Sequence, residues 1–113
     1  MREQELGGNI VLVNFNFDNQ EMIIAKKIIG NYAMKIRQVS DYRELKVEMK
    51  IHKKAKLKQY EFKVLGVFEG FNASSEIQGF NAFVVLDEVM KKILAETKHK
   101  MRKEDIHKWK EKE

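Results

Sequence analysis

Residues 45–52, Leu45-Lys46-Val47-Glu48-Met49-Lys50-Ile51-His52, alternate apolar and polar side chains without a break. This alternation predicts a β-strand with one buried face and one face in water. Tyr60 to Val64 alternate in the same way, and a slip in the pattern at residues 65–67 predicts a bulge or a bend. Phe71 to Ile77 follow as a further strand. Three consecutive strands predict an antiparallel meander.

The segments on either side of this meander predict one more strand and two helices. Ile10–Phe15 is rich in β-branched residues and predicts a first strand. Asp18 stands three residues before Glu21, the spacing of a capping box, so a helix is expected to begin there. The second helix is expected from Phe80 to about Lys103, with an apolar stripe formed by Phe83, Val85, Leu86, Val89, Met90, Ile93 and Leu94.

The predicted order is therefore β-α-β-β-β-α, an α+β fold. Both helices must bury their stripes, so they are expected to pack on one face of a four-stranded sheet as a two-layer sandwich. Val47, Phe62, Val89 and Ile93 are expected to share its core. The predicted domain covers residues 9–103, between a flexible N-terminal tail at 1–8 and a charged C-terminal tail at 104–113.

Composition excludes several classes of function. The chain has 113 residues and no cysteine, so disulfides, thiolate catalysis and cysteine-bound zinc are excluded. Its sequence has no phosphate-binding glycine loop, no nucleophile with a candidate base and no histidine spacing suited to a metal. Apolar runs are too short to span a membrane, and the N-terminus is unlike a secretory signal. These features predict a cytoplasmic protein, monomeric when free, with no catalysis, cofactor, metal, small-molecule substrate or membrane partner.

Positive charge is concentrated in the second predicted helix and beyond it. Residues 91–110 contain eight lysines and arginines against three acidic residues, and this local excess equals the net charge of +5 for the whole chain. Most of these cations, from Lys98 onward, follow the end of the apolar stripe at Leu94. A basic helix of this kind favours polyanionic partners.

Three short motifs, in the right order and spacing, resemble the short hibernation-promoting factors and ribosome-associated inhibitors. Leu45-Lys46-Val47-Glu48 resembles the second strand of that family. Phe71-Asn72-Ala73-Ser74-Ser75-Glu76 resembles its last strand. Thr97-Lys98-His99-Lys100 resembles a turn of its second helix. Asp18 and Ile29 replace residues typical of the family, so the resemblance is to a distant member.

The resemblance implies a fold similar in shape to double-stranded-RNA-binding domains. It also implies binding to the decoding channel of the small ribosomal subunit, where the protein overlaps tRNA and mRNA and silences translation under stress. Lys26, Lys98, His99 and Lys100 match basic positions of the family. Resemblance and charge together predict an rRNA-binding set: Lys26, Lys27, Lys35, Lys91, Lys92, Lys98, His99, Lys100, Arg102 and Lys103.

Two other classes of function stay open from the residues alone. One is a general double-stranded-RNA-binding module that reads the shape of A-form RNA. The other is a protein-interaction module that uses Ile106 and Trp109. The lysines of residues 53–58 have two interpretations. They either contact phosphate groups of a nucleic acid or protect a strand edge from unwanted pairing.

Overall fold

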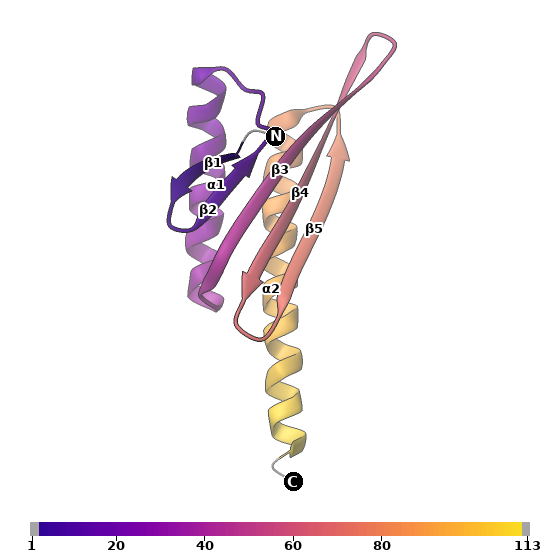
Figure 1. The fold of residues 1–113 in the computed structure, drawn as a ribbon. Coiled ribbons are helices and arrows are strands. Elements are labelled where there is room, and N and C mark those ends of the chain that lie inside the picture. The colour runs from indigo at the N-terminus through magenta and orange to yellow at the C-terminus, as the bar shows by residue number, and fades with distance from the viewer. Residues whose placement is uncertain (1–2, 112–113) are drawn as a thin grey trace.

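Five strands and two helices make up the chain (Figure 1). The computed structural model describes the backbone of residues 3–111 and the side chains of residues 3–53 and 55–102. The elements, in order, are β1 (Glu3–Gly7), β2 (Ile10–Val13), α1 (Asn19–Val39), β3 (Tyr42–Lys54), β4 (Leu57–Phe68), β5 (Asn72–Gly79) and α2 (Ala82–Glu111). The α+β class and the order of the predicted elements are confirmed.

The sheet has five strands in the order β1-β2-β3-β4-β5, so the prediction of four strands is wrong. α1 connects β2 to β3, which pair in parallel, and every other neighbouring pair is antiparallel. The additional strand, β1, lies within the segment predicted to be a flexible tail. β1 has no alternating pattern, because Leu6 is its one large apolar residue. The strand forms because its backbone pairs with the otherwise open edge of β2.

Local capping sets where both helices begin. Glu21 N donates to Asp18 Oδ1 at 2.8 Å and Asp18 N donates to Glu21 Oε1 at 2.9 Å, which confirms the predicted capping box of α1. Asn81 Oδ1 accepts from Phe83 N and Val84 N, both at 3.2 Å, at the start of α2. α2 continues to Glu111, beyond the end at about Lys103 that the sequence predicts. Lysine and glutamate, which make up half of residues 104–111, are good helix formers.

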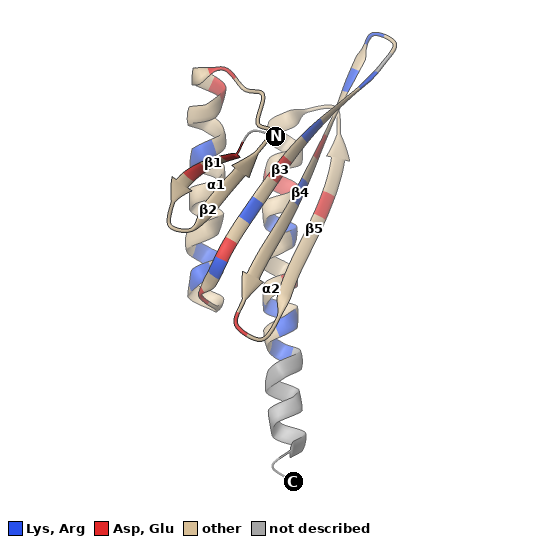
Figure 2. Cartoon of the chain, viewed as in Figure 1, with Lys and Arg blue, Asp and Glu red and all other residues tan. Residues whose placement is uncertain are grey.

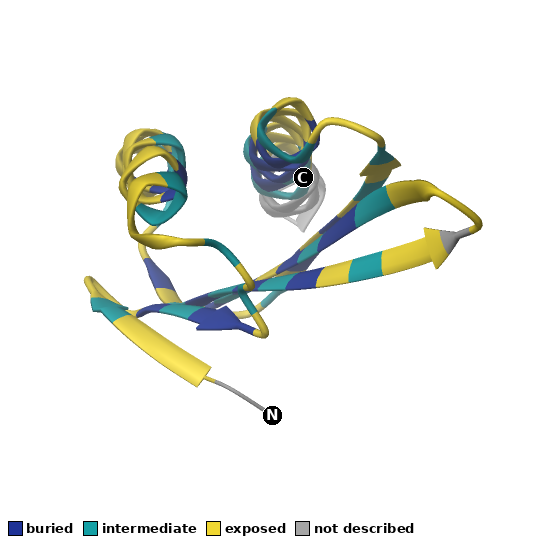
Figure 3. Cartoon of the chain, turned by 90° about the horizontal axis from the view of Figure 1, so that it is seen from above, coloured by how far each residue is buried: buried dark blue, intermediate teal, exposed yellow. Residues whose placement is uncertain are grey.

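Both helices lie on the same face of the sheet, and the core lies between these two layers (Figure 3). α2 packs on β4 and β5, and α1 packs beside α2. Val47, Phe62, Val89 and Ile93 are all completely buried, as predicted. The arrangement leaves the outer faces of both helices and the opposite face of the sheet in water.

The predicted bulge at residues 65–67 of β4 is not observed. Alternation continues, with Leu65 exposed and Gly66 buried, and the irregularity lies in β3, between Tyr42 and Glu44. A Cβ atom on Gly66 would lie 2.8 Å from the ring of Phe68. The ring of Phe68 occupies the space over the backbone of Gly66, and for this reason glycine interrupts the apolar pattern at this position. Phe68 is held there by stacking on Phe71, with ring centres 4.7 Å apart.

Candidate nucleic-acid interface

The solvent face of α2 carries a row of cations. Lys91, Lys98 and Arg102 are all exposed, and their spacing of seven and four residues places them on one face of the helix. The face opposite them is buried through Ile93 and Thr97. Thr97 extends the docked part of α2 one turn beyond the predicted stripe, because it is fully buried and its hydroxyl donates to Ile93 O at 2.8 Å.

A tyrosine connects this row to α1. Burial and a hydrogen bond to Asp87 of α2 raise the pKa of Tyr32, which lies on α1. Lys35 Nζ lies 5.2 Å from the centre of the Tyr32 ring, and Asp87 is one helical turn before Lys91. Lys35 and Lys91 therefore lie on either side of the junction between the helices.

We call the resulting surface the helix ridge. Lys27 is exposed on α1 about two turns before Lys35, a spacing that keeps it on the solvent side of the helix. Lysines and arginines are spread along both helices (Figure 2). Glu96 is the one acidic residue of α2 between Lys91 and Arg102, and it lies on the opposite side of the helix. The ridge consists of Lys27, Lys35, Lys91, Lys98 and Arg102.

The other predicted site residues are not part of this ridge. Lys26 lies on the opposite side of α1, against the β1–β2 hairpin, where it lines a depression with Glu3 and Leu12. Lys92 faces the edge of the sheet beside Ser75 and Glu76. His99 is seven residues after Lys92 and therefore lies on the same side of α2 as Lys92. Lys100 is half-buried. The side chain of Lys103 lies outside the described residues.

Arg37 has a structural role that its sequence context does not reveal. Its Nη2 donates to the backbone carbonyl of Gly8 at 2.7 Å, and its guanidinium carbon lies 4.8 Å from the centre of the Tyr42 ring. Arg37 therefore holds the β1–β2 turn against α1. These two contacts fix the position of the guanidinium at the turn, although only one of its five N–H donors is used.

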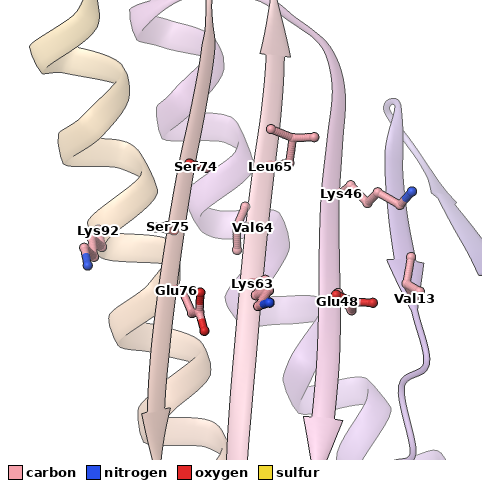
Figure 4. Close-up of a pocket in the computed structure, with 10 residues that line it drawn as sticks. All are labelled: Val13, Lys46, Glu48, Lys63, Val64, Leu65, Ser74, Ser75, Glu76 and Lys92. Carbon is pink, nitrogen blue, oxygen red and sulfur yellow. The ribbon is translucent and has the colours of Figure 1, made fainter.

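The outer face of the sheet carries charges of both signs. It holds a depression of about 610 Å³ (Figure 4), where Lys63 lies directly opposite Glu48 on β3 and Glu76 on β5. Lys46 Nζ is 3.8 Å from a carboxylate oxygen of Glu3. Since each of these lysines has a carboxylate neighbour, this face offers a polyanion much less net charge than the helix ridge does.

Glu61 is the one buried carboxylate among the described residues. A hydrogen bond with Glu76 and a second with His52, whose Nε2 is 2.8 Å from Glu61 Oε1, lower the pKa of Glu61 to about 2. The same hydrogen bond raises the pKa of Glu76. As pH falls, Glu76 is therefore protonated before Glu61.

Acid is expected to destabilise the protein through Glu61. Its folded-state pKa lies below the ordinary value of 4.5, so its carboxylate stabilises the fold above pH 4.5, and this contribution is lost as pH falls toward 2. In Glu61→Gln, the free energy of unfolding, measured by denaturant titration across this range, should depend less on pH. The exposed Glu69→Gln is the control and should keep the wild-type dependence. An unchanged pH dependence in Glu61→Gln would contradict this role.

Comparison with known proteins shows the fold. No family model matches the chain, and no curated protein matches it. Among solved structures, it is similar to the Protein Y N-terminal domain of Thermus thermophilus, with a TM-score of 0.52 and 14% sequence identity, over 80% of this chain and 91% of that one. The predicted likeness to double-stranded-RNA-binding domains stays a prediction.

Two absences hold for the described residues and concern metals and membranes. No group of three histidine, aspartate or glutamate side chains in that part of the chain is placed to hold a metal ion. No described helix combines the length and the apolar character needed to cross a membrane.

Proposed function

We propose that this protein is a distant member of the hibernation-promoting factors, which binds the rRNA of the small ribosomal subunit and silences translation. The observation that carries the proposal is the helix ridge, where five cations from two helices share one surface. The likeness in fold to the Protein Y domain supports the choice of partner. A protein with this role acts in the cytoplasm, as a monomer that binds a much larger RNA surface.

The proposed mechanism is occlusion without catalysis. The ridge lysines and Arg102 pair with phosphate oxygens, and the planar guanidinium of Arg102 can engage two of them at once. The sheet and the two helices form one packed body, so binding through the ridge fills the decoding channel with folded protein. tRNA and mRNA are then excluded by volume.

Sedimentation with purified ribosomal subunits tests this function. The protein should sediment with small subunits and not with large ones, and excess tRNA should displace it. A double-helical RNA of unrelated sequence should compete poorly. If that RNA competes as well as small subunits do, the protein is a general double-stranded-RNA-binding module. If small subunits do not bind the protein, the proposed function is wrong.

Binding to small subunits is expected to depend steeply on salt. Each phosphate contact contributes about −0.9 to the slope of log affinity against log salt, so the five ridge cations by themselves contribute about −4.5, and any further phosphate contact makes the slope steeper. Raising monovalent salt from about 50 to about 200 mM should therefore weaken binding at least about 500-fold. Fluorescence anisotropy of labelled protein measures this. A flat response would exclude phosphate contacts and favour a protein-interaction module.

A further inference from the structure

The β3–β4 hairpin projects beyond the rest of the sheet. β2 pairs with β3 only from Leu45 to Glu48, and β5 ends where Gly79 pairs with Tyr60. Beyond Ile51 and Tyr60 the two strands pair only with each other, down to a turn at Ala55 and Lys56. We call this two-stranded extension, residues 52–59, the basic ribbon. It lies at the end of the molecule opposite the C-terminal end of α2 (Figure 1).

The basic ribbon carries four lysines and no acidic residue. Lys53 lies directly opposite Lys58 in the ladder. Like charges in facing positions destabilise a strand pair. Within the described part of the chain, the exposed Lys53, Lys56 and Lys58 make no ion pair. This contrasts with the outer sheet face, where Lys46 and Lys63 each have a carboxylate neighbour.

The base of the ribbon is anchored to the body. His52 contacts the buried carboxylate of Glu61, and Ile51 and Tyr60 pack against the core. These contacts fix the direction in which the basic ribbon leaves the sheet. Its lysines therefore project from two strands that are already paired. Binding through such an element requires little additional ordering.

We propose that the basic ribbon is a second phosphate-binding arm, which contacts double-helical rRNA while the helix ridge contacts the subunit elsewhere. This rests on the proposed function. RNA supplies closely spaced phosphates that can neutralise the facing Lys53 and Lys58 from outside the fold. Leu57, 64% exposed next to the turn, adds an apolar contact for a sugar or base. Two surfaces with a net positive charge on one body fit a single extended polyanion.

The test compares two triple variants of the full chain. Lys53→Gln, Lys56→Gln and Lys58→Gln together remove three of the ribbon's four positive charges, including the facing pair Lys53 and Lys58, so the fold should be kept. The control, Lys46→Gln, Lys50→Gln and Lys63→Gln, removes the same charge from the outer sheet face. The ribbon variant should bind small subunits at least about tenfold more weakly, with a salt slope smaller by about 3, relative to the control.

The outcomes separate the ribbon from the proposed function. Equal affinity and salt slope in the ribbon variant and the control would overturn the ribbon proposal and leave the proposed function intact. If the ribbon variant only aggregates more, its lysines protect strand edges, which also overturns the proposal. If the wild type does not bind small subunits, the same variants are compared on a double-helical RNA oligonucleotide. Equal binding of that RNA would reject the arm.

Discussion

Replacing Phe62 by alanine is expected to lower the free energy of unfolding by about 3–5 kcal/mol. Phe62 is completely buried on β4, where it pairs with Met49 on β3 and Ile77 on β5. Its ring centre lies 5.7 Å from that of Phe15 and 6.4 Å from that of Phe17, in the loop between β2 and α1. The smaller side chain would leave a cavity where three strands and this loop meet. Denaturant titration measures the loss.

Leu65→Ala is the matched control for this variant. Leu65 lies three residues further along β4, on the outer face of the sheet, where 38% of it is exposed. Truncating it should cost less than about 1 kcal/mol, because little apolar surface returns to water. If Phe62→Ala were no less stable than Leu65→Ala, the assignment of Phe62 to the centre of the core would be wrong.

Neutralising the helix ridge on α2 is expected to weaken binding to small subunits by on the order of a thousandfold or more. The variant combines Lys91→Gln, Lys98→Gln and Arg102→Gln. A hydrogen bond assisted by charge contributes about 1.5–3 kcal/mol, so losing three of them has an effect of this size. All three side chains are exposed, so the fold should be kept. Anisotropy with labelled protein measures affinity, and circular dichroism confirms the fold.

The outer sheet face provides the control for the ridge. Lys46→Gln, Lys50→Gln and Lys63→Gln remove the same net charge, so a general loss of attraction would weaken both variants equally. Binding of the control should stay within about threefold of wild type, because its lysines already have carboxylate neighbours. If the control loses binding and the ridge variant does not, the sheet is the RNA-facing side and the proposed mechanism is wrong.

The sequence alone was sufficient for the elements whose signals are local. Side chains on one face recur every two residues in a strand and about every 3.6 residues in a helix. The alternation around Val47 therefore predicted a strand, and the apolar stripe around Val89 predicted a helix. The capping box at Asp18 depends on residues three apart, and it formed as predicted. β1 was missed because Leu6 is its one large apolar residue, and what orders it is the open edge of β2.

The candidate site was predicted less completely than the fold. Charge counting identified the basic helix, but it could not distinguish Lys91 from Lys92, which point to different sides of α2. It also could not show that Arg37 is held by Gly8, 29 residues away in the sequence. No local pattern records a contact of this kind, since it depends on the path of the chain between the two residues.

Sequence by itself therefore determined the two helices and four of the five strands, which faces are apolar and where positive charge concentrates, because each of these depends on neighbours within one or two turns. Only the tertiary structure decided which cations act as one surface. Packing α1 beside α2 unites Lys35 with Lys91 across Tyr32 and Asp87. Strand pairing places Lys63 between two glutamates, yet sets Lys53 opposite Lys58. Neutralisation of a charge depends on distance in space, and folding alone sets that distance.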